Sequence, residues 1–77
     1  MIDITVKLFA QYRENQFKIE NRQYPDNFTA IDVVHDIGLD IEKLEIGGLM
    51  VNSRHVKEDY QLKNGDILAI FPKIGGG

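Results

Sequence analysis

The stretch that decides the fold is an apolar strand followed by a glycine ribbon, Ile67-Leu68-Ala69-Ile70-Phe71-Pro72-Lys73-Ile74-Gly75-Gly76-Gly77. The unbroken apolar run is typical of a strand buried in the middle of a sheet. Pro72 lacks a backbone N–H and is expected to close that strand. The three glycines have no Cβ and no preferred backbone conformation, so they predict a thin ribbon that ends in the carboxylate of Gly77. A narrow tunnel in a partner protein could admit such a ribbon and exclude a bulkier one.

The first half of the chain predicts a hairpin followed by one helix. Apolar and polar residues alternate over residues 2–9 and again over 16–21, and the polar connection 10–15 has hairpin length. Residues 30–37 carry apolar side chains at helical spacing. Thr29 is placed as the N-cap, with Asp32 completing a capping box, and Gly38 is placed to end the helix in the left-handed conformation.

The second half predicts further strands. Residues 49–51 form a short apolar run, and residues 52–54 turn the chain. A short strand follows in the region of Val56 and residues 60–62, and residues 64–66 (Asn-Gly-Asp) are a strong turn signal. The segment 39–48 fits either a helical turn or a coil. The order predicts an α+β fold, a mixed sheet of about four to five strands with one main helix on one face. The first and last strands are the most apolar and are expected to pair in parallel at its centre.

Composition narrows the function classes. A chain of 77 residues forms one small core, with no room for a deep catalytic cleft of its own. The net charge of −3 and the scattered Lys and Arg argue against nucleic acid as a partner. No apolar run approaches the ~20 residues of a membrane span, and no signal segment is evident. The absence of cysteine favours a reducing cytoplasm and leaves no thiol nucleophile or thiolate ligand. His35 and His55 are far apart and the acidic residues of 36–45 are typical of a solvated face, so no metal site is expected.

Three segments together resemble one family. They are Val6-Lys7-Leu8-Phe9-Ala10-Gln11-Tyr12-Arg13-Glu14, then Val51-Asn52 with Leu62-Lys63-Asn64-Gly65-Asp66-Ile67, and finally residues 71–77. They are similar to the Phe-Ala-x-x-Arg-Glu start, the Val-Asn to Leu-x-x-Gly-Asp-x module and the Phe-Pro-Pro-Val-small-Gly-Gly tail of the MoaD-type sulfur carriers, the small subunits of molybdopterin synthase. Lys73 in place of the second proline and Gly75 in place of the small residue are departures that make the tail more flexible.

The resemblance implies a ubiquitin-like β-grasp domain over residues 1–73 and a flexible tail over 74–77 that carries the reactive terminus. The carboxylate of Gly77 would be adenylated and converted to a thiocarboxylate, with Gly75 and Gly76 bound by the partner. From the residues themselves, Phe71 and Pro72 either finish the core or form an apolar shoulder that docks on the partner beside the tail; docking is the prediction for both and for Ile74. The chain would bind no cofactor and would not be catalytic alone.

The same resemblance implies three protein partners. They are a ubiquitin-activating-like adenylyltransferase that uses ATP, a sulfur-donor protein, and the large subunit of molybdopterin synthase.

Three alternatives stay open. A thiamine-pathway sulfur carrier would share the chemistry, although the Phe-Ala-x-x-Arg-Glu start and the Phe-Pro end speak against it. A ubiquitin-like protein modifier would be conjugated to lysines through Gly77 after the same adenylation. A plain β-grasp binding module would carry an inert, frayed tail, as chain ends often do.

Overall fold

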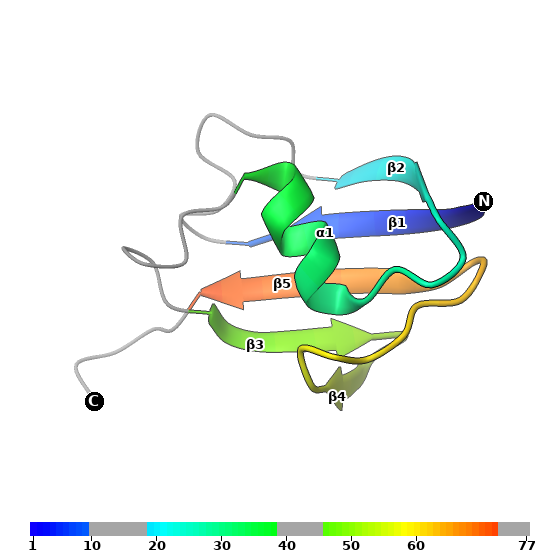
Figure 1. The fold of residues 1–77 in the computed structure, drawn as a ribbon. Helices are drawn as coiled ribbons and strands as arrows, with labels where there is room; N and C mark the ends of the chain where they lie inside the picture. The colour runs from blue at the N-terminus through cyan, green and yellow to red at the C-terminus, as the bar shows by residue number, and fades with distance from the viewer. Residues whose placement is uncertain (10–18, 39–45, 73–77) are drawn as a thin grey trace.

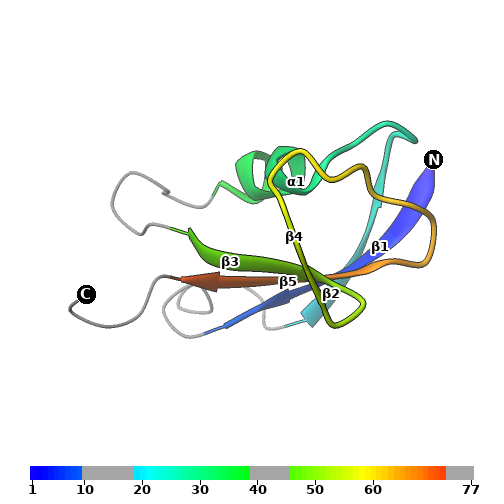
Figure 2. The ribbon, with the colours of Figure 1, turned by 90° about the horizontal axis from the view of Figure 1, so that it is seen from below.

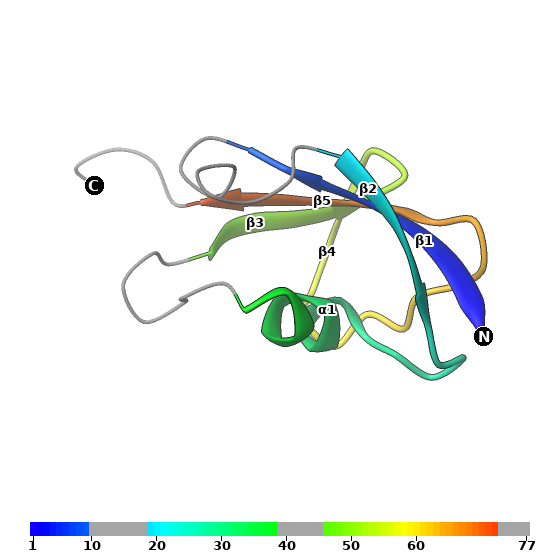
Figure 3. The ribbon, with the colours of Figure 1, turned by 90° about the horizontal axis from the view of Figure 1, so that it is seen from above.

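The computed structural model describes residues 1–9, 19–38 and 46–72 of the chain (Figure 1). These residues form a five-stranded sheet and one helix, in the order β1 (Ile2–Leu8), β2 (Ile19–Tyr24), α1 (Ala30–Ile37), β3 (Ile46–Val51), β4 (Arg54–Val56) and β5 (Ile67–Pro72). The strands lie in the spatial order β2-β1-β5-β3-β4. Views from below and above show α1 on one side of the sheet (Figures 2 and 3). The α+β layout with a mixed sheet and one main helix is confirmed.

The expected central pair is also confirmed. β1 and β5 run parallel, from Thr5 opposite Ile67 to Leu8 opposite Ile70, and neither strand is at an edge of the sheet. β2 pairs antiparallel with the outer side of β1, and β3 pairs antiparallel with the other side of β5. The last strand of the chain is therefore its structural centre.

The core lies between α1 and the sheet face that it covers. Alternate side chains of β1 and β5 point toward the helix, as the period of two in their sequence requires. The buried apolar side chains come from α1, from β1, β2, β3 and β5, and from the loop before β5: Ile2, Ile4, Val6, Leu8, Tyr24, Ala30, Val33, Val34, Ile37, Leu49, Val51, Leu62, Leu68 and Ile70. The opposite face of the sheet, here called the open face, has no helix among the described residues.

The helix begins and ends where the sequence places its caps. The Thr29 Oγ1 accepts a hydrogen bond from the Asp32 backbone N–H at 3.4 Å, and the Asp32 Oδ2 accepts one from the Thr29 N–H at 3.0 Å. At the other end, Gly38 adopts φ 83°, a left-handed conformation that glycine reaches without a Cβ clash. The hydrogen bonds between Asp32 and Thr29 also lower the pKa of the Asp32 carboxyl group.

Two strand boundaries, the end of β2 and the start of β3, differ from the sequence predictions. β2 continues to Tyr24 instead of ending at residue 21, because Arg22 and Tyr24 face Ile4 and Ile2 across the pair. The polar residues 20–23 hid the continuation of β2 from the sequence analysis. Arg22 lies on the helix side of the sheet because its guanidinium contacts the Asp36 carboxylate of α1 at 3.3 Å, so it needs no apolar partner there. β3 begins at Ile46, three residues before the predicted run.

The structure also gives the bounds of the short strand that the sequence predicted near Val56. β4 is Arg54–Val56, joined to β3 by a tight turn in which Asn52 and Ser53 have φ 52° and 70°. Positive φ at both central residues is the hairpin geometry that matches strand twist. Residues 60–62 contribute only an isolated bridge between Gln61 and Thr29. The predicted connection 10–15 and the segment 39–45 lie outside the described residues, as does the boundary drawn at residue 73.

The buried carboxylate of Asp66 links two turns that lie at the start of β5, the turn at Asn52 and the turn at Lys63. Asp66 is 7% exposed, and its Oδ1 accepts a hydrogen bond from the Asn52 side-chain amide at 3.0 Å. Its Oδ2 accepts one from the Lys63 backbone N–H at 2.8 Å. Asn52 in turn accepts from the Ile67 N–H through Oδ1 and donates its own N–H to the Ile67 carbonyl, both at 3.0 Å. The start of β5 is thus held by side chains as well as by its neighbouring strands.

We expect Asp66→Ala to lower the free energy of unfolding by about 1–3 kcal/mol, because two donors at the start of β5 lose their acceptor. Denaturant titration measures the change, and Asp59→Ala, at an exposed position, serves as the control. If both variants lose the same small amount, the Asp66 network does not contribute as described.

We also expect the helix cap to be lost in acid. The folded-state pKa of Asp32 lies below its ordinary value of 3.8, so its stabilisation is complete above that value and disappears as the pH falls through the lowered pKa. The stability difference between wild type and Asp32→Asn should therefore shrink as the pH drops. A difference that stays constant from neutral to strongly acidic pH contradicts this expectation.

Candidate functional site

The C-terminal end of β5 lies directly before the predicted tail, and strands on both sides fix it. Ile70 lies opposite Leu8 of β1 and Leu49 of β3, and Phe71 lies opposite Gly48. The pairing with β3 shifts register between Ile46 and Gly48. Such irregularities bend a strand locally and are common beside functional sites. The backbone that precedes the tail is consequently held in place up to Pro72.

An aromatic pair sits at this strand end. The rings of Phe9 and Phe71 stack with their centroids 4.4 Å apart and an interplanar angle of 14°. Both side chains are half-buried. The parallel register explains the contact, because Leu8 and Ile70 are partners and the next residue of each strand points to the open face. Phe9 therefore supports the ring that precedes the tail.

Apolar side chains continue from this pair along the open face. Leu68 and Ile70 are buried under the helix, so Ile67, Ala69 and Phe71 point the other way. Ile67 is 40% exposed, and Ala69 pairs with the half-buried Met50 of β3. We call this row the open-face strip, and its members are Phe9, Met50, Ile67, Ala69 and Phe71. A partly exposed apolar strip beside a chain end is a natural contact surface for a partner.

The structure describes two of the predicted site residues, and their roles stay predictions. Phe71 lies near the end of β5 on the open-face strip. Pro72 lies in β5 and pairs with Ile46, although its side chain is not among those described. Ile74 and the tail residues Gly75, Gly76 and Gly77 lie outside the described residues. Sequence reasoning missed Phe9, which the parallel register of residues 8 and 70 would have placed beside Phe71.

The remaining titratable candidates do not converge. His35 is exposed on α1, and His55 is exposed on β4, where it pairs with Met50 of the open face. Asp36 contacts Arg22. Over residues 1–9, 19–38 and 46–72, no group of three His, Asp or Glu side chains could hold a metal ion. Within the same residues, no helix is long and apolar enough to cross a membrane.

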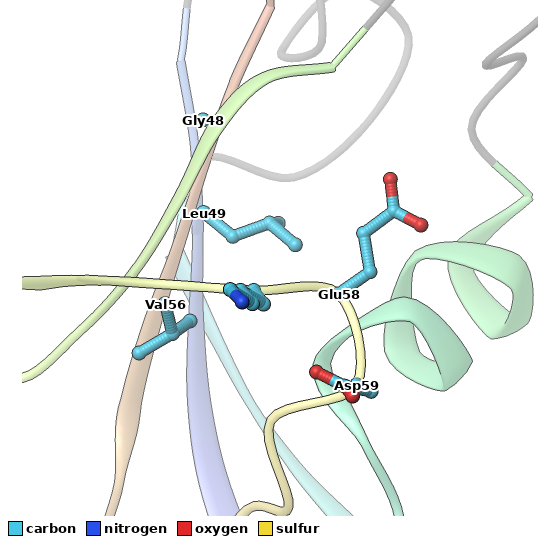
Figure 4. A pocket seen from close by; sticks show the side chains of 6 residues that line it. Gly48, Leu49, Val56, Glu58 and Asp59 are labelled. Carbon is cyan, nitrogen blue, oxygen red and sulfur yellow. The ribbon is translucent and has the colours of Figure 1, made fainter.

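A shallow pocket of about 560 Å³ is lined by residues of β3, of β4 and of the loop after β4 (Figure 4). Leu49 and Val56 form its apolar wall, and Glu58 and Asp59 lie on the loop after β4. The described lining contains none of the predicted tail or docking residues. Its charged residues, Lys57, Glu58 and Asp59, are all exposed to solvent.

Comparison with models of known protein families shows which family the chain belongs to. The profile described as the ThiS family matches residues 6–77. The chain belongs to the ThiS family. It is thus a ubiquitin-like sulfur carrier of the MoaD/ThiS type, as the three sequence segments indicated. A comparison with curated protein sequences found no match.

Solved structures confirm the β-grasp fold of this ThiS-family chain. A Pyrococcus furiosus protein assigned to subunit 1 of molybdopterin converting factor has a TM-score of 0.75 and 27% identity, over 96% of this chain and 100% of that one. Small archaeal modifier protein 1 of Haloferax volcanii has a TM-score of 0.73 and 18% identity, over 96% and 100%. A complex of subunits 1 and 2 of molybdopterin-converting factor from Helicobacter pylori matches with a TM-score of 0.65 and 14% identity, over 99% and 100%.

We expect the Phe9–Phe71 stack to couple the ends of β1 and β5. A double-mutant cycle with Phe9→Leu and Phe71→Leu should give a coupling energy of about 0.5–1.5 kcal/mol in the free energy of unfolding. The two single variants keep an apolar side chain, so the cycle isolates the ring contact. Additive effects of the two substitutions would mean that the stack does not support Phe71.

Proposed function

We propose that this chain is the sulfur-donating small subunit of a molybdopterin synthase. The carboxylate of Gly77 attacks the α-phosphorus of ATP on an adenylyltransferase of the ubiquitin-activating type, which releases pyrophosphate and forms an acyl-adenylate. Hydrosulfide released by a sulfur-donor protein then attacks the acyl carbon, the bond from that carbon to AMP breaks, and a thiocarboxylate is left on Gly77. The large subunit takes this end into its active site and transfers the sulfur to a pterin precursor.

The observation that carries the proposal is the paired strand end beside an apolar strip. β5 pairs with β1 as far as Ile70 and with β3 as far as Pro72, and the Phe9–Phe71 stack lies beside that end. This arrangement gives the tail a fixed origin and gives a partner a surface to bind next to it. A fixed origin matters because transfer requires the reacting atoms to be positioned within about an ångström.

In this proposal the chain supplies some of the chemical groups that the reaction needs, and its partners supply the others. A chain without cysteine can still carry sulfur, because the sulfur atom is bonded to the backbone terminus rather than to a side chain. The activating enzyme supplies the ATP site, and the large subunit supplies the acid and base groups. The chain itself contributes the carboxylate of Gly77, the narrow Gly75-Gly76 segment, and the docking residues Phe71, Pro72 and Ile74. It needs no bound cofactor for this role.

The likeness to molybdopterin converting factor subunit 1, at 27% identity, supports this choice of pathway. The complex of subunits 1 and 2 from Helicobacter pylori supports a large subunit as the partner. The likeness to small archaeal modifier protein 1 supports a second candidate, in which Gly77 is conjugated to lysines of target proteins. Both candidates share the acyl-adenylate step, and a thiamine-pathway carrier shares the thiocarboxylate as well.

Intact mass spectrometry separates these functions. The chain is incubated with ATP, the activating enzyme and a sulfur donor, and then with the large subunit and a pterin precursor. Exchange of one oxygen for sulfur, reversed on addition of the large subunit and precursor, supports the proposal. Exchange without reversal supports the thiamine pathway, high-mass adducts support the modifier, and an unchanged mass supports an inert tail.

The length of the tail gives a separate prediction. Deleting Gly77 leaves a Gly-Gly ending but withdraws the carboxylate by about 3.6 Å, the span of one extended residue. We expect sulfur transfer to fall on the order of a hundredfold or more, because a misplacement of ~1 Å already costs about that much. Gly76→Val should block activation through its β-branch while the free energy of unfolding stays unchanged.

Asp59→Asn, far from the tail in sequence and exposed, is the control for both tail variants. A fully active deletion variant would show that the glycine ending matters and its reach does not. Normal sulfur loading of Gly76→Val would show that no narrow channel receives the tail.

A further inference from the structure

The turn before β5 holds an Asn-Gly pair against the start of β1. The Asp66 N–H donates to the Lys63 carbonyl at 3.0 Å, and Gly65, the third residue of this four-residue turn, has φ 89°. A positive φ at that position identifies a type II turn. The backbone of Asp3 contacts both residues of the pair: its N–H donates to Asn64 Oδ1, and its carbonyl accepts from the Gly65 N–H, each at 2.8 Å.

An Asn-Gly pair can react with itself. The backbone nitrogen of Gly65 can attack the side-chain amide carbon of Asn64, forming a C–N bond and expelling ammonia, while the nitrogen gives up its proton. The product is a five-membered succinimide ring. Water then opens the ring at either carbonyl and leaves aspartate or isoaspartate. Glycine permits this attack best because no Cβ obstructs the nitrogen, and both residues are exposed to water.

The folded turn opposes ring closure in two ways. In a type II turn, ψ of the second residue is about +120°, which rotates the nitrogen of Gly65 away from the Asn64 side chain. The two hydrogen bonds to Asp3 fix the same groups that must meet, since one holds the side-chain oxygen and the other holds the attacking N–H. Attack therefore requires the turn to separate from β1.

We propose that Asn64–Gly65 is a deamidation site that the pairing of the turn with β1 keeps closed. The modification then marks chains in which the start of β1 has separated from the start of β5. Isoaspartate inserts one extra backbone methylene between the two residues, so the paired contacts to Asp3 cannot both re-form. A chain modified while open is left with a weakened turn at the centre of its sheet.

The test compares the whole chain folded in mildly alkaline buffer with the same chain in guanidinium chloride. Site-resolved peptide mapping follows the replacement of the side-chain NH₂ by OH, and an isoaspartyl methyltransferase detects the isomer. We expect deamidation at Asn64 to be at least about tenfold slower in the folded chain, because it requires local opening. A smaller ratio overturns the proposal.

Two variants test whether the folded turn is the reason for slow deamidation at Asn64. Asp66→Ala keeps Asn64–Gly65 but removes the acceptor for the Lys63 N–H, and it should speed deamidation in native buffer. Asn64→Gln should abolish the signal at this site, which confirms the assignment of the peptide. Asn27, followed by Phe28, is an internal reference with a bulky neighbour. An Asp66→Ala rate equal to that of wild type would overturn the role of the turn.

Discussion

Backbone pairing between the first and the last strand is the interaction on which the other elements depend. Thr5 to Leu8 pair with Ile67 to Ile70; β2 pairs with β1, β3 pairs with β5, and β4 joins the sheet through β3. α1 packs on the face that they form, with Val33 and Val34 fully buried. Without β5, β3 and β4 would have no connection to β1 and β2. The predicted reactive tail follows the strand whose placement requires the whole domain to be folded.

Polar residues secure the beginning of that strand, and apolar residues secure its end. At the beginning, Asp66 and Asn52 connect two turns through side-chain hydrogen bonds in a half-buried position. A buried carboxylate is tolerated there because each of its oxygens accepts a hydrogen bond. At the end, the Phe9 and Phe71 rings stack on the open face. Directional contacts fix the register of β5, and the apolar end leaves a surface suited to reversible binding.

Most of the fold could be predicted from local patterns. Alternation in β1, the capping residues Thr29 and Asp32 and the apolar run of β5 each act over a few residues, so the sequence displays them directly. The extension of β2 to Tyr24 could not be read in this way, because Arg22 lies on the helix side by pairing with Asp36, which is distant in sequence. Phe9 was missed for the same reason, since its role arises from the register between β1 and β5. The tail chemistry depends on partners, and only the resemblance indicated it.

The central position of β5 has a consequence for synthesis. β5 is synthesised about 65 residues after the start of β1, an interval of roughly 3–13 s at 5–20 residues per second. During that interval the nascent chain carries the apolar edge of β1, with Ile4, Val6 and Leu8, without its permanent neighbour. An unpaired apolar strand edge is a site of aggregation. The nascent chain is therefore at its most vulnerable just before its last strand emerges, and shielding by a chaperone would have its largest effect at that stage.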